Sequence, residues 1–212
     1  MKKLKFFVDF KKEEKWLELM ALQGWMLVKQ GFFYTFNKSQ PEEVNIKIDF
    51  RYFKNCADYM EYRQLFEDSG WKLIAGSMNN GNQYFKKINE DSDDDIFSDD
   101  ASRSGRYKRL SYSMLFILLF LIPFTVFSHL KGMINLNVFI DPKILYLTPG
   151  LWDMSGMDFW RRFIFETPFA LMRGFSWSIT IILLGVYIFL TIKSWIVYKK
   201  VRCTDEQIKE GN

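Results

Sequence analysis

Histidine and cysteine are nearly absent from this chain of 212 residues, which has one histidine and two cysteines. The single imidazole, His129, cannot supply the usual acid–base pairs or a histidine-rich metal site. Cys56 and Cys203 lack the close spacing of a metal motif, and two isolated cysteines do not make a disulfide framework. These absences argue against metal-dependent and thiol-dependent chemistry.

The motifs of common enzymes are also missing: there is no glycine-rich phosphate loop, no Gly-x-Ser-x-Gly, no His-Glu-x-x-His and no Cys-x-x-Cys. The acidic run 90–100 has the composition of a calcium loop. However, Ile96 stands where an EF-hand needs glycine, and Ser102 stands where it needs its last glutamate. We therefore expect no enzyme activity, no cofactor and no metal.

A strong charge imbalance is absent as well. The net charge is +4, and in the first 88 residues basic side chains are interspersed with acidic ones rather than gathered into a patch. No nucleic-acid partner is expected. The basic amino end, Met1 to Lys5, is not followed by an apolar stretch, so no cleaved signal peptide is expected.

Asp, Glu, Lys and Arg are missing from two apolar stretches, residues 112–130 and 175–192. As a helix, the first stretch is roughly 28 Å long, which matches the hydrocarbon core of a bilayer. A buried helix of a soluble protein is the alternative, but such a helix usually keeps a polar stripe, and neither stretch has one. We expect two transmembrane helices, 111–130 and 175–198, and hence a lipid bilayer as partner.

Basic residues precede the first stretch and follow the second. In a hairpin of two transmembrane helices, these two positions lie on the same side of the membrane. The positive-inside bias places them, and with them both termini, at the cytoplasmic face of the cell inner membrane. Five further basic residues lie between the stretches, where a long segment weakens the bias. The residues expected to contact the membrane surface are Arg103, Arg106, Lys108, Arg109, Lys199, Lys200 and Arg202.

The first 88 residues contain an internal repeat. Trp16, Gly24 and Trp25 recur as Tyr62, Gly70 and Trp71 at one constant offset. Each copy is predicted to fold as strand, helix, strand, strand: 3–10, 11–22, 25–29 and 32–36, then 44–50, 57–68, 71–75 and 83–87. We expect an α+β domain over 1–88, in which two βαββ units form one antiparallel sheet with two helices on one face, a ferredoxin-like arrangement.

Aromatic residues are abundant in this domain and have two interpretations. One is packing in the core, because a domain of this size must bury most of its large side chains. The other is a pocket on the uncovered face of the sheet that stacks on a flat or cationic apolar ligand. The candidate ligand-binding residues are Trp16, Trp25, Tyr34, Trp71 and Tyr84.

Several short motifs in the first 110 residues resemble a known family. They are Phe7-Val8-Asp9-Phe10, Glu13-Glu14-Lys15-Trp16-Leu17, Gly24-Trp25, Gly70-Trp71, Tyr84-Phe85, and Ile96-Phe97-Ser98-Asp99 with Ser102 and Tyr107. Together they resemble the bacterial family called domain of unknown function 2812. The resemblance implies a cytoplasmic domain anchored in the inner membrane, often followed by two spans and often encoded beside a PadR-type transcriptional regulator. It implies no catalytic or ligand-binding residues.

Residues 89–110 join the domain to the first apolar stretch and change from acidic to basic along their length. Such a segment is expected to be solvated and mobile. It is either a passive spacer or an adjustable tether whose bases are attracted to anionic lipid. The apolar pair Ile96-Phe97 within it is a candidate for docking onto the domain.

The segment 131–174 is long and rich in aromatic residues. Two short extended pieces, 135–139 and 144–147, are predicted around a turn at Asp141-Pro142. A separate amphipathic helix is expected to start near Ser155 and to lie in the outer interface, as an anchor or as a partner surface. The partner-contact candidates are Trp160, Arg161, Arg162 and Phe163. The tail, 199–212, is expected to be cytoplasmic.

Two classes of function are compatible with these features. The favoured one is a membrane-anchored binding and regulatory module that captures a protein or apolar ligand at the inner face of a bacterial membrane. The alternative is an accessory subunit of a membrane transport or peptide-defence complex. Polar groups of the kind that move a substrate are scarce inside the apolar stretches, so transport by this chain alone is not expected. The oligomeric state is left open.

Overall fold

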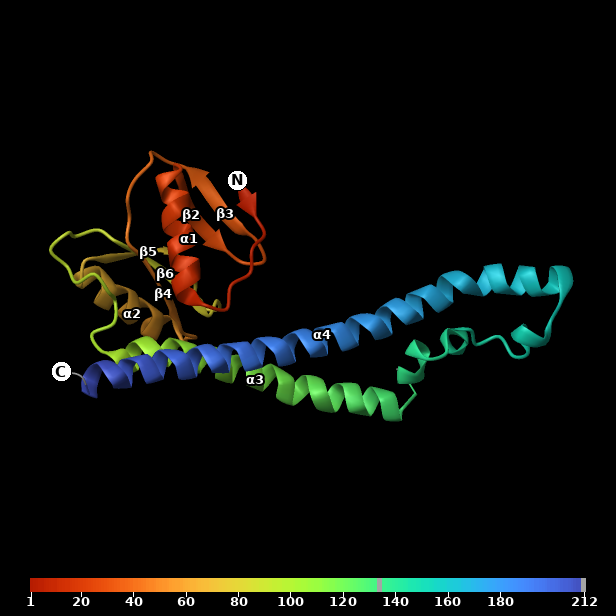
Figure 1. Ribbon diagram of the computed structural model, residues 1–212. Coiled ribbons are helices and arrows are strands. Elements are labelled where there is room, and N and C mark those ends of the chain that lie inside the picture. The colour runs from red at the N-terminus through yellow and green to blue at the C-terminus, as the bar shows by residue number, and fades with distance from the viewer. Residues whose placement is uncertain (133–134, 211–212) are drawn as a thin grey trace. The chain divides into compact units, whose positions relative to one another are not determined.

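The computed structural model describes residues 1–132 and 135–210 and divides the chain into two compact units. The first unit contains residues 1–113 and the carboxyl end from residue 192, and the second contains residues 114–191. The first unit holds a mixed α+β domain built from two similar halves (Figure 1).

Each half of the domain contains the same four elements. The first half comprises β1 (Lys2–Lys3), α1 (Phe10–Leu22), β2 (Trp25–Gln30) and β3 (Tyr34–Lys38). The second half comprises β4 (Ile46–Phe50), α2 (Cys56–Asp68), β5 (Trp71–Ala75) and β6 (Asn82–Lys87). Strand β1 is much shorter than the predicted strand 3–10. The end of the predicted strand belongs to α1, because the side chain of Asp9 accepts a hydrogen bond from the Lys11 backbone N–H and caps this helix.

The strands form two antiparallel sheets rather than the single predicted sheet. Their orders are β1-β3-β2 and β4-β6-β5. Strands β2 and β5 are in contact, but no ladder joins the two sheets within the described part of the chain. Each of these two strands carries a register shift, between Leu27 and Lys29 and between Leu73 and Ala75. The predicted ferredoxin-like single sheet is therefore corrected to two three-stranded sheets. The bulge in each of β2 and β5 locally disrupts pairing with the neighbouring strand and increases the twist.

The repeat extends to the features that begin and end the helices. Asp9 and Asn55 cap the amino ends of α1 and α2, and Gly24 and Gly70 follow their carboxyl ends with φ of 78° and 81°. The bulges occur at the same constant offset. Left-handed glycine after a helix satisfies the final carbonyls, so both halves end their helices by the same device.

Replacing Gly70 with alanine is expected to lower the free energy of unfolding by about 1–3 kcal/mol, because a side chain at positive φ is strained. An added Cβ would also lie 1.9 Å from Ser92 Oγ and 2.9 Å from Asn89 Cβ. Gly31→Ala is the matched control, since a Cβ there meets nothing within 4 Å. Urea unfolding followed by circular dichroism compares the two. Equal midpoints for both variants would contradict the expectation.

Two long apolar helices follow the domain. Helix α3 (Asp100–Leu130) has a mean hydropathy of 2.2 in its most apolar window, and α4 (Gly156–Glu210) has 2.1. Both are long and apolar enough to cross a membrane. The two helices are in contact in the first unit, where the rings of Tyr112 and Trp195 lie 6.4 Å apart.

Helix α4 corrects the prediction of a separate amphipathic helix in front of the second apolar stretch. It runs without interruption from Gly156 through both segments. Pro168 lies inside it and does not end it. A single proline is tolerated in apolar helices, and no cluster of turn residues follows it.

The segment between α3 and α4 contains three short 3₁₀ helices: η1 (Leu136–Phe139), η2 (Pro142–Leu145) and η3 (Leu151–Asp153). The predicted extended pieces at 135–139 and 144–147 are therefore wrong. The side chains of Asn135 and Asp141 accept hydrogen bonds from backbone N–H groups two residues later, and such local bonds favour turns over strands.

Candidate functional site

The first turns of α3 dock on the N-terminal domain through buried charges. Arg106 is only 2% exposed. Its Nη1 donates hydrogen bonds to Glu14 Oε1 and to the carbonyl oxygen of Ile48, each at 2.5 Å. Glu14 Oε1 also accepts from the Ile48 backbone N–H at 3.0 Å. One guanidinium thus connects α3 to both α1 and β4.

Aromatic rings surround this guanidinium. Its central carbon lies 5.1–5.2 Å from the ring centroids of Phe10, Phe97 and Tyr107. Tyr107 is fully buried, and its hydroxyl donates to Asp9 Oδ1 at 3.1 Å. Cation–π contacts strengthen when they are desolvated, so the rings stabilise the buried charge in addition to the ion pair.

A second ion pair lies one helical turn further along α3. Arg109 Nη2 donates to Asp49 Oδ1 at 2.5 Å, and Arg109 Nε donates to the carbonyl oxygen of Phe50. The other oxygen of Asp49 accepts from the Tyr62 hydroxyl of α2 at 3.0 Å. We call Glu14, Asp49, Arg106, Tyr107 and Arg109 the docking junction.

The docking junction corrects part of the predicted membrane-surface set. Arg106 is buried in protein and is not available to lipid, and Arg109 is held by Asp49. Arg103 pairs with Asp95 at 3.1 Å. The remaining members are exposed, and their contact with a membrane surface stays a prediction: Lys108, Lys199, Lys200 and Arg202.

The segment 89–99 packs on the domain instead of forming a mobile tether. Ile96 packs against the cluster of Tyr62, Trp71 and Phe85, which confirms the predicted docking of this apolar residue. Asp94 pairs with Lys87 at 2.8 Å, and its carbonyl oxygen accepts from Asn45 Nδ2 at 2.9 Å. Asp94 therefore attaches this segment to the domain through one ion pair and one hydrogen bond.

A second buried carboxylate, Glu13, lies beside Glu14 on α1. It is 2% exposed, and its Oε1 accepts hydrogen bonds from the hydroxyls of Tyr34 at 2.7 Å and Tyr84 at 2.6 Å. Burial raises the pKa of Glu13 to about 7, against the lowering effect of the two hydroxyls. Burial also raises the pKa of Glu14, while Arg106 acts in the opposite direction. Glu13 therefore changes charge near neutral pH.

The five aromatic ligand candidates do not gather at one place. Trp71 lies in the cluster with Tyr62 and Phe85, whereas Tyr34 and Tyr84 are buried around Glu13. Trp16 is half-buried against Tyr34, with ring centroids 5.0 Å apart, and Trp25 is half-buried in β2. Binding of a ligand by these five residues stays a prediction.

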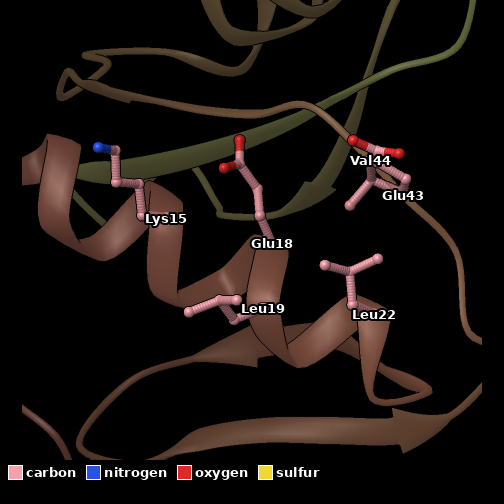
Figure 2. A pocket seen from close by; sticks show the side chains of 6 residues that line it. All are labelled: Lys15, Glu18, Leu19, Leu22, Glu43 and Val44. Carbon is pink, nitrogen blue, oxygen red and sulfur yellow. The ribbon is translucent and has the colours of Figure 1, made fainter.

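An open cavity of about 270 Å³ lies along the outer side of α1 (Figure 2). Leu19, Leu22 and Val44 supply its apolar lining, and both leucines are exposed. Lys15, Glu18 and Glu43 form the charged part of the lining. Figure 2 shows the α1 side chains along one helix and Glu43 with Val44 on the segment that leads into β4. We call this cavity the α1 groove.

The second unit has a core of its own. Glu166 accepts hydrogen bonds from the backbone N–H groups of Leu147 and Thr148 and from Arg173 Nη2 at 2.9 Å. Phe163 stacks on Tyr146 at 5.1 Å, so this partner-contact candidate packs inside the unit. Trp160 is 55% exposed, and Arg161 and Arg162 are exposed too. Their contact with a partner stays a prediction.

The buried acids of α1 were missed by the sequence reasoning, although a signal was present. Phe10, Glu13, Glu14, Leu17, Met20 and Ala21 follow helical spacing and form the buried face of α1. A carboxylate that occupies a position on the apolar face of a helix is expected to be buried. Such a carboxylate needs a buried partner, because unpaired buried charges are strongly disfavoured. The structure was needed only to identify the partners of these acids, which are Arg106 for Glu14 and two tyrosines for Glu13.

Neither the curated proteins nor the solved structures contain a match to this chain. A family model described as "Protein of unknown function (DUF2812)" matches residues 9–120. That range begins at the cap of α1, includes the docking junction and ends within α3. Since the match covers more than half of the chain, the protein belongs to the DUF2812 family.

Proposed function

We propose that this protein is a membrane-anchored binding and regulatory module that captures a protein or apolar ligand at the inner face of a bacterial membrane. Helices α3 and α4 cross the membrane, and the N-terminal domain and both termini lie in the cytoplasm. The docking junction is the observation that carries the proposal.

Exposed apolar side chains support the membrane part of the proposal. Along α3, Phe116, Phe120 and Phe124 are 60–65% exposed, and along α4, Ile182 and Phe189 are each 61% exposed. A soluble protein rarely leaves such continuous apolar surface in water, whereas lipid covers it without cost. Exposed Lys108 precedes the apolar stretch of α3, and exposed Lys199 and Lys200 follow the apolar stretch of α4. These bases favour a cytoplasmic placement of both ends of the hairpin.

The docking junction supports regulation rather than simple anchoring. An anchor needs only a flexible tether, but here the first turns of α3 are held by two ion pairs and a buried tyrosine. Buried ion pairs add little net stability compared with apolar packing, and their attested use is to fix one arrangement. A fixed arrangement lets a change in the domain alter the orientation of α3.

The α1 groove is the proposed capture site. Its leucines offer an exposed apolar surface to an apolar side chain of a partner or to an apolar ligand. Leu19 and Leu22 of α1 line the groove, and Glu14 of the same helix pairs with Arg106. A ligand in the groove and the docking of α3 therefore both act on α1. Coupling free energies of about 1–3 kcal/mol are typical of such linked sites.

Photo-crosslinking in intact cells tests the capture site. A photoreactive amino acid at Leu22 is expected to give a discrete adduct, whereas the same group at exposed Lys72 on β5 gives none. Leu19→Asp in the same chain should abolish the Leu22 adduct, because a carboxylate in the apolar lining disfavours the ligand. The proposed capture site is wrong if Leu22 and Lys72 give the same products, or if Leu19→Asp leaves the adduct unchanged.

The accessory-subunit alternative is favoured by one feature, the second unit with its exposed Trp160 and Phe165. A chimera that joins residues 1–113 to an unrelated transmembrane helix separates the two functions. If the chimera keeps the Leu22 adduct, the native spans and outer segment are dispensable for capture. If the adduct disappears although the domain stays folded, the accessory role is favoured.

A further inference from the structure

A second cavity, of about 250 Å³, lies next to the docking junction on the first unit. Its lining comes from α1, β4, the segment before α3, and α3 itself. The lining residues are Lys11, Glu14, Lys15, Glu18, Lys47, Asp95, Arg103 and Arg106. Five of these side chains are basic and three are acidic.

The three acids of this cavity are already bonded within the protein. Glu14 is paired with Arg106, and Asp95 is paired with Arg103. Glu18 Oε1 accepts from the Ile46 backbone N–H at 3.2 Å. Among the described residues, no ion pair is recorded for Lys11, Lys15 or Lys47. The cavity thus has more basic than acidic side chains, and its acids are already engaged by other groups of the protein.

Arg106 supplies an unused hydrogen-bond donor at the same cavity. Its side chain is 3% exposed, and its Nη1 is engaged by Glu14 and Ile48. Its Nε–H is buried and has no acceptor within the described residues. Leaving a buried charged donor unpaired is costly, so a ligand oxygen that accepts from Nε would be strongly favoured.

We infer that this cavity binds a phosphate group. A phosphate oxygen accepts from Arg106 Nε, while Lys11 and Lys47 neutralise the remaining charge, a combination suited to an anion with several acceptor oxygens. The apolar stretch of α3 starts at Tyr112, about 9 Å along the helix from Arg106. The phosphate therefore comes either from a soluble phosphorylated ligand or from an anionic lipid head group. This cavity shares Lys15 and Glu18 with the charged part of the α1 groove, but Lys11, Lys47 and Arg106 line this cavity and not the groove. Phosphate binding here does not require that the groove captures a partner.

The experiment uses the full chain in nanodiscs, with binding measured by isothermal titration calorimetry and by the melting temperature of the N-terminal domain. In the first arm, inorganic pyrophosphate is added to nanodiscs of phosphatidylcholine. In the second arm, no pyrophosphate is added, and phosphatidylglycerol replaces part of the phosphatidylcholine. The test variant is Lys11→Gln/Lys47→Gln, which changes two lining residues that the α1 groove does not share. The matched control is Lys38→Gln/Lys72→Gln on exposed positions of β3 and β5.

The expected result is binding or a rise in melting temperature in at least one arm, which weakens at least about tenfold in Lys11→Gln/Lys47→Gln and is unchanged in the control. A response to pyrophosphate identifies a soluble ligand, and a response to phosphatidylglycerol alone identifies a lipid head group. The inference is overturned if wild-type protein responds in neither arm, or if the test variant and the control respond equally. Retention of the Leu22 crosslink in the test variant shows separately that capture at the groove is intact.

Discussion

Replacing Arg106 with alanine is expected to lower the free energy of unfolding of the N-terminal domain by about 3–5 kcal/mol. The substitution leaves Glu14 buried without its ion-pair partner, and an uncompensated buried charge has a cost of this size. The carbonyl oxygen of Ile48 also loses its bond to Nη1, and three aromatic rings lose the guanidinium between them.

Hydrogen exchange of the full chain in detergent measures this effect in α1 and β4, where the amides should exchange at least a hundredfold faster. Arg63→Ala is the control, because its pair with Glu67 is exposed and contributes less than about 1 kcal/mol. Glu14→Met/Arg106→Met removes both charges and should be less destabilising than Arg106→Ala alone. If Arg106→Ala and Arg63→Ala behave alike, the docking junction does not hold α3 to the domain.

Glu13 is expected to make the stability of the domain depend on pH in the direction opposite to most carboxylates. Its folded-state pKa of about 7 lies above the ordinary value of 4.5. The folded protein therefore binds more protons than the unfolded chain between these values. The contribution of Glu13 is fully present below pH 4.5 and is lost as the pH rises through 7, for a total of about 3 kcal/mol.

The groups that face Glu13 come from every neighbouring element: Tyr34 on β3, Tyr84 on β6, Glu14 on α1 and Arg106 on α3. Glu13→Gln keeps an oxygen for the two tyrosine hydroxyls and cannot titrate. Urea unfolding between pH 5 and 8.5 should show the variant equal to wild type at the acidic end and more stable at the alkaline end. Glu61→Gln on the exposed side of α2 is the control and should follow wild type. A constant difference between Glu13→Gln and wild type at all pH values would contradict this role.

Local features of the domain were predictable because short-range chemistry determines them. The predicted strand 71–75 coincides with β5, and Gly24 and Gly70 end their helices as expected. The first predicted strand illustrates the limit, since β1 contains only Lys2–Lys3 and Asp9 caps a helix where a strand was expected. The strands divide into two sheets, and the alternating apolar pattern of β2 and β5 indicates neither this division nor the register shifts within these strands.

The candidate site was less predictable because its partners are distant in sequence. Arg106 and Glu14 are separated by 92 positions, so neither the basic cluster nor the Glu-Glu pair reveals the other. The positive-inside pattern predicted that Arg106 and Arg109 contact lipid. This inference applies to exposed basic residues, whereas Arg106 and Arg109 form ion pairs with acidic residues of the folded domain. The first compact unit accordingly includes these residues and extends to Ser113.

Alkaline extraction of native membranes tests most directly whether lipid surrounds the apolar stretches of α3 and α4. The full chain is expected to stay with the vesicles after a carbonate wash, and Arg106→Ala should stay with them too, because the docking junction does not anchor the chain. Release of the intact protein into the wash, as a monodisperse species without detergent, would contradict the membrane-anchored module.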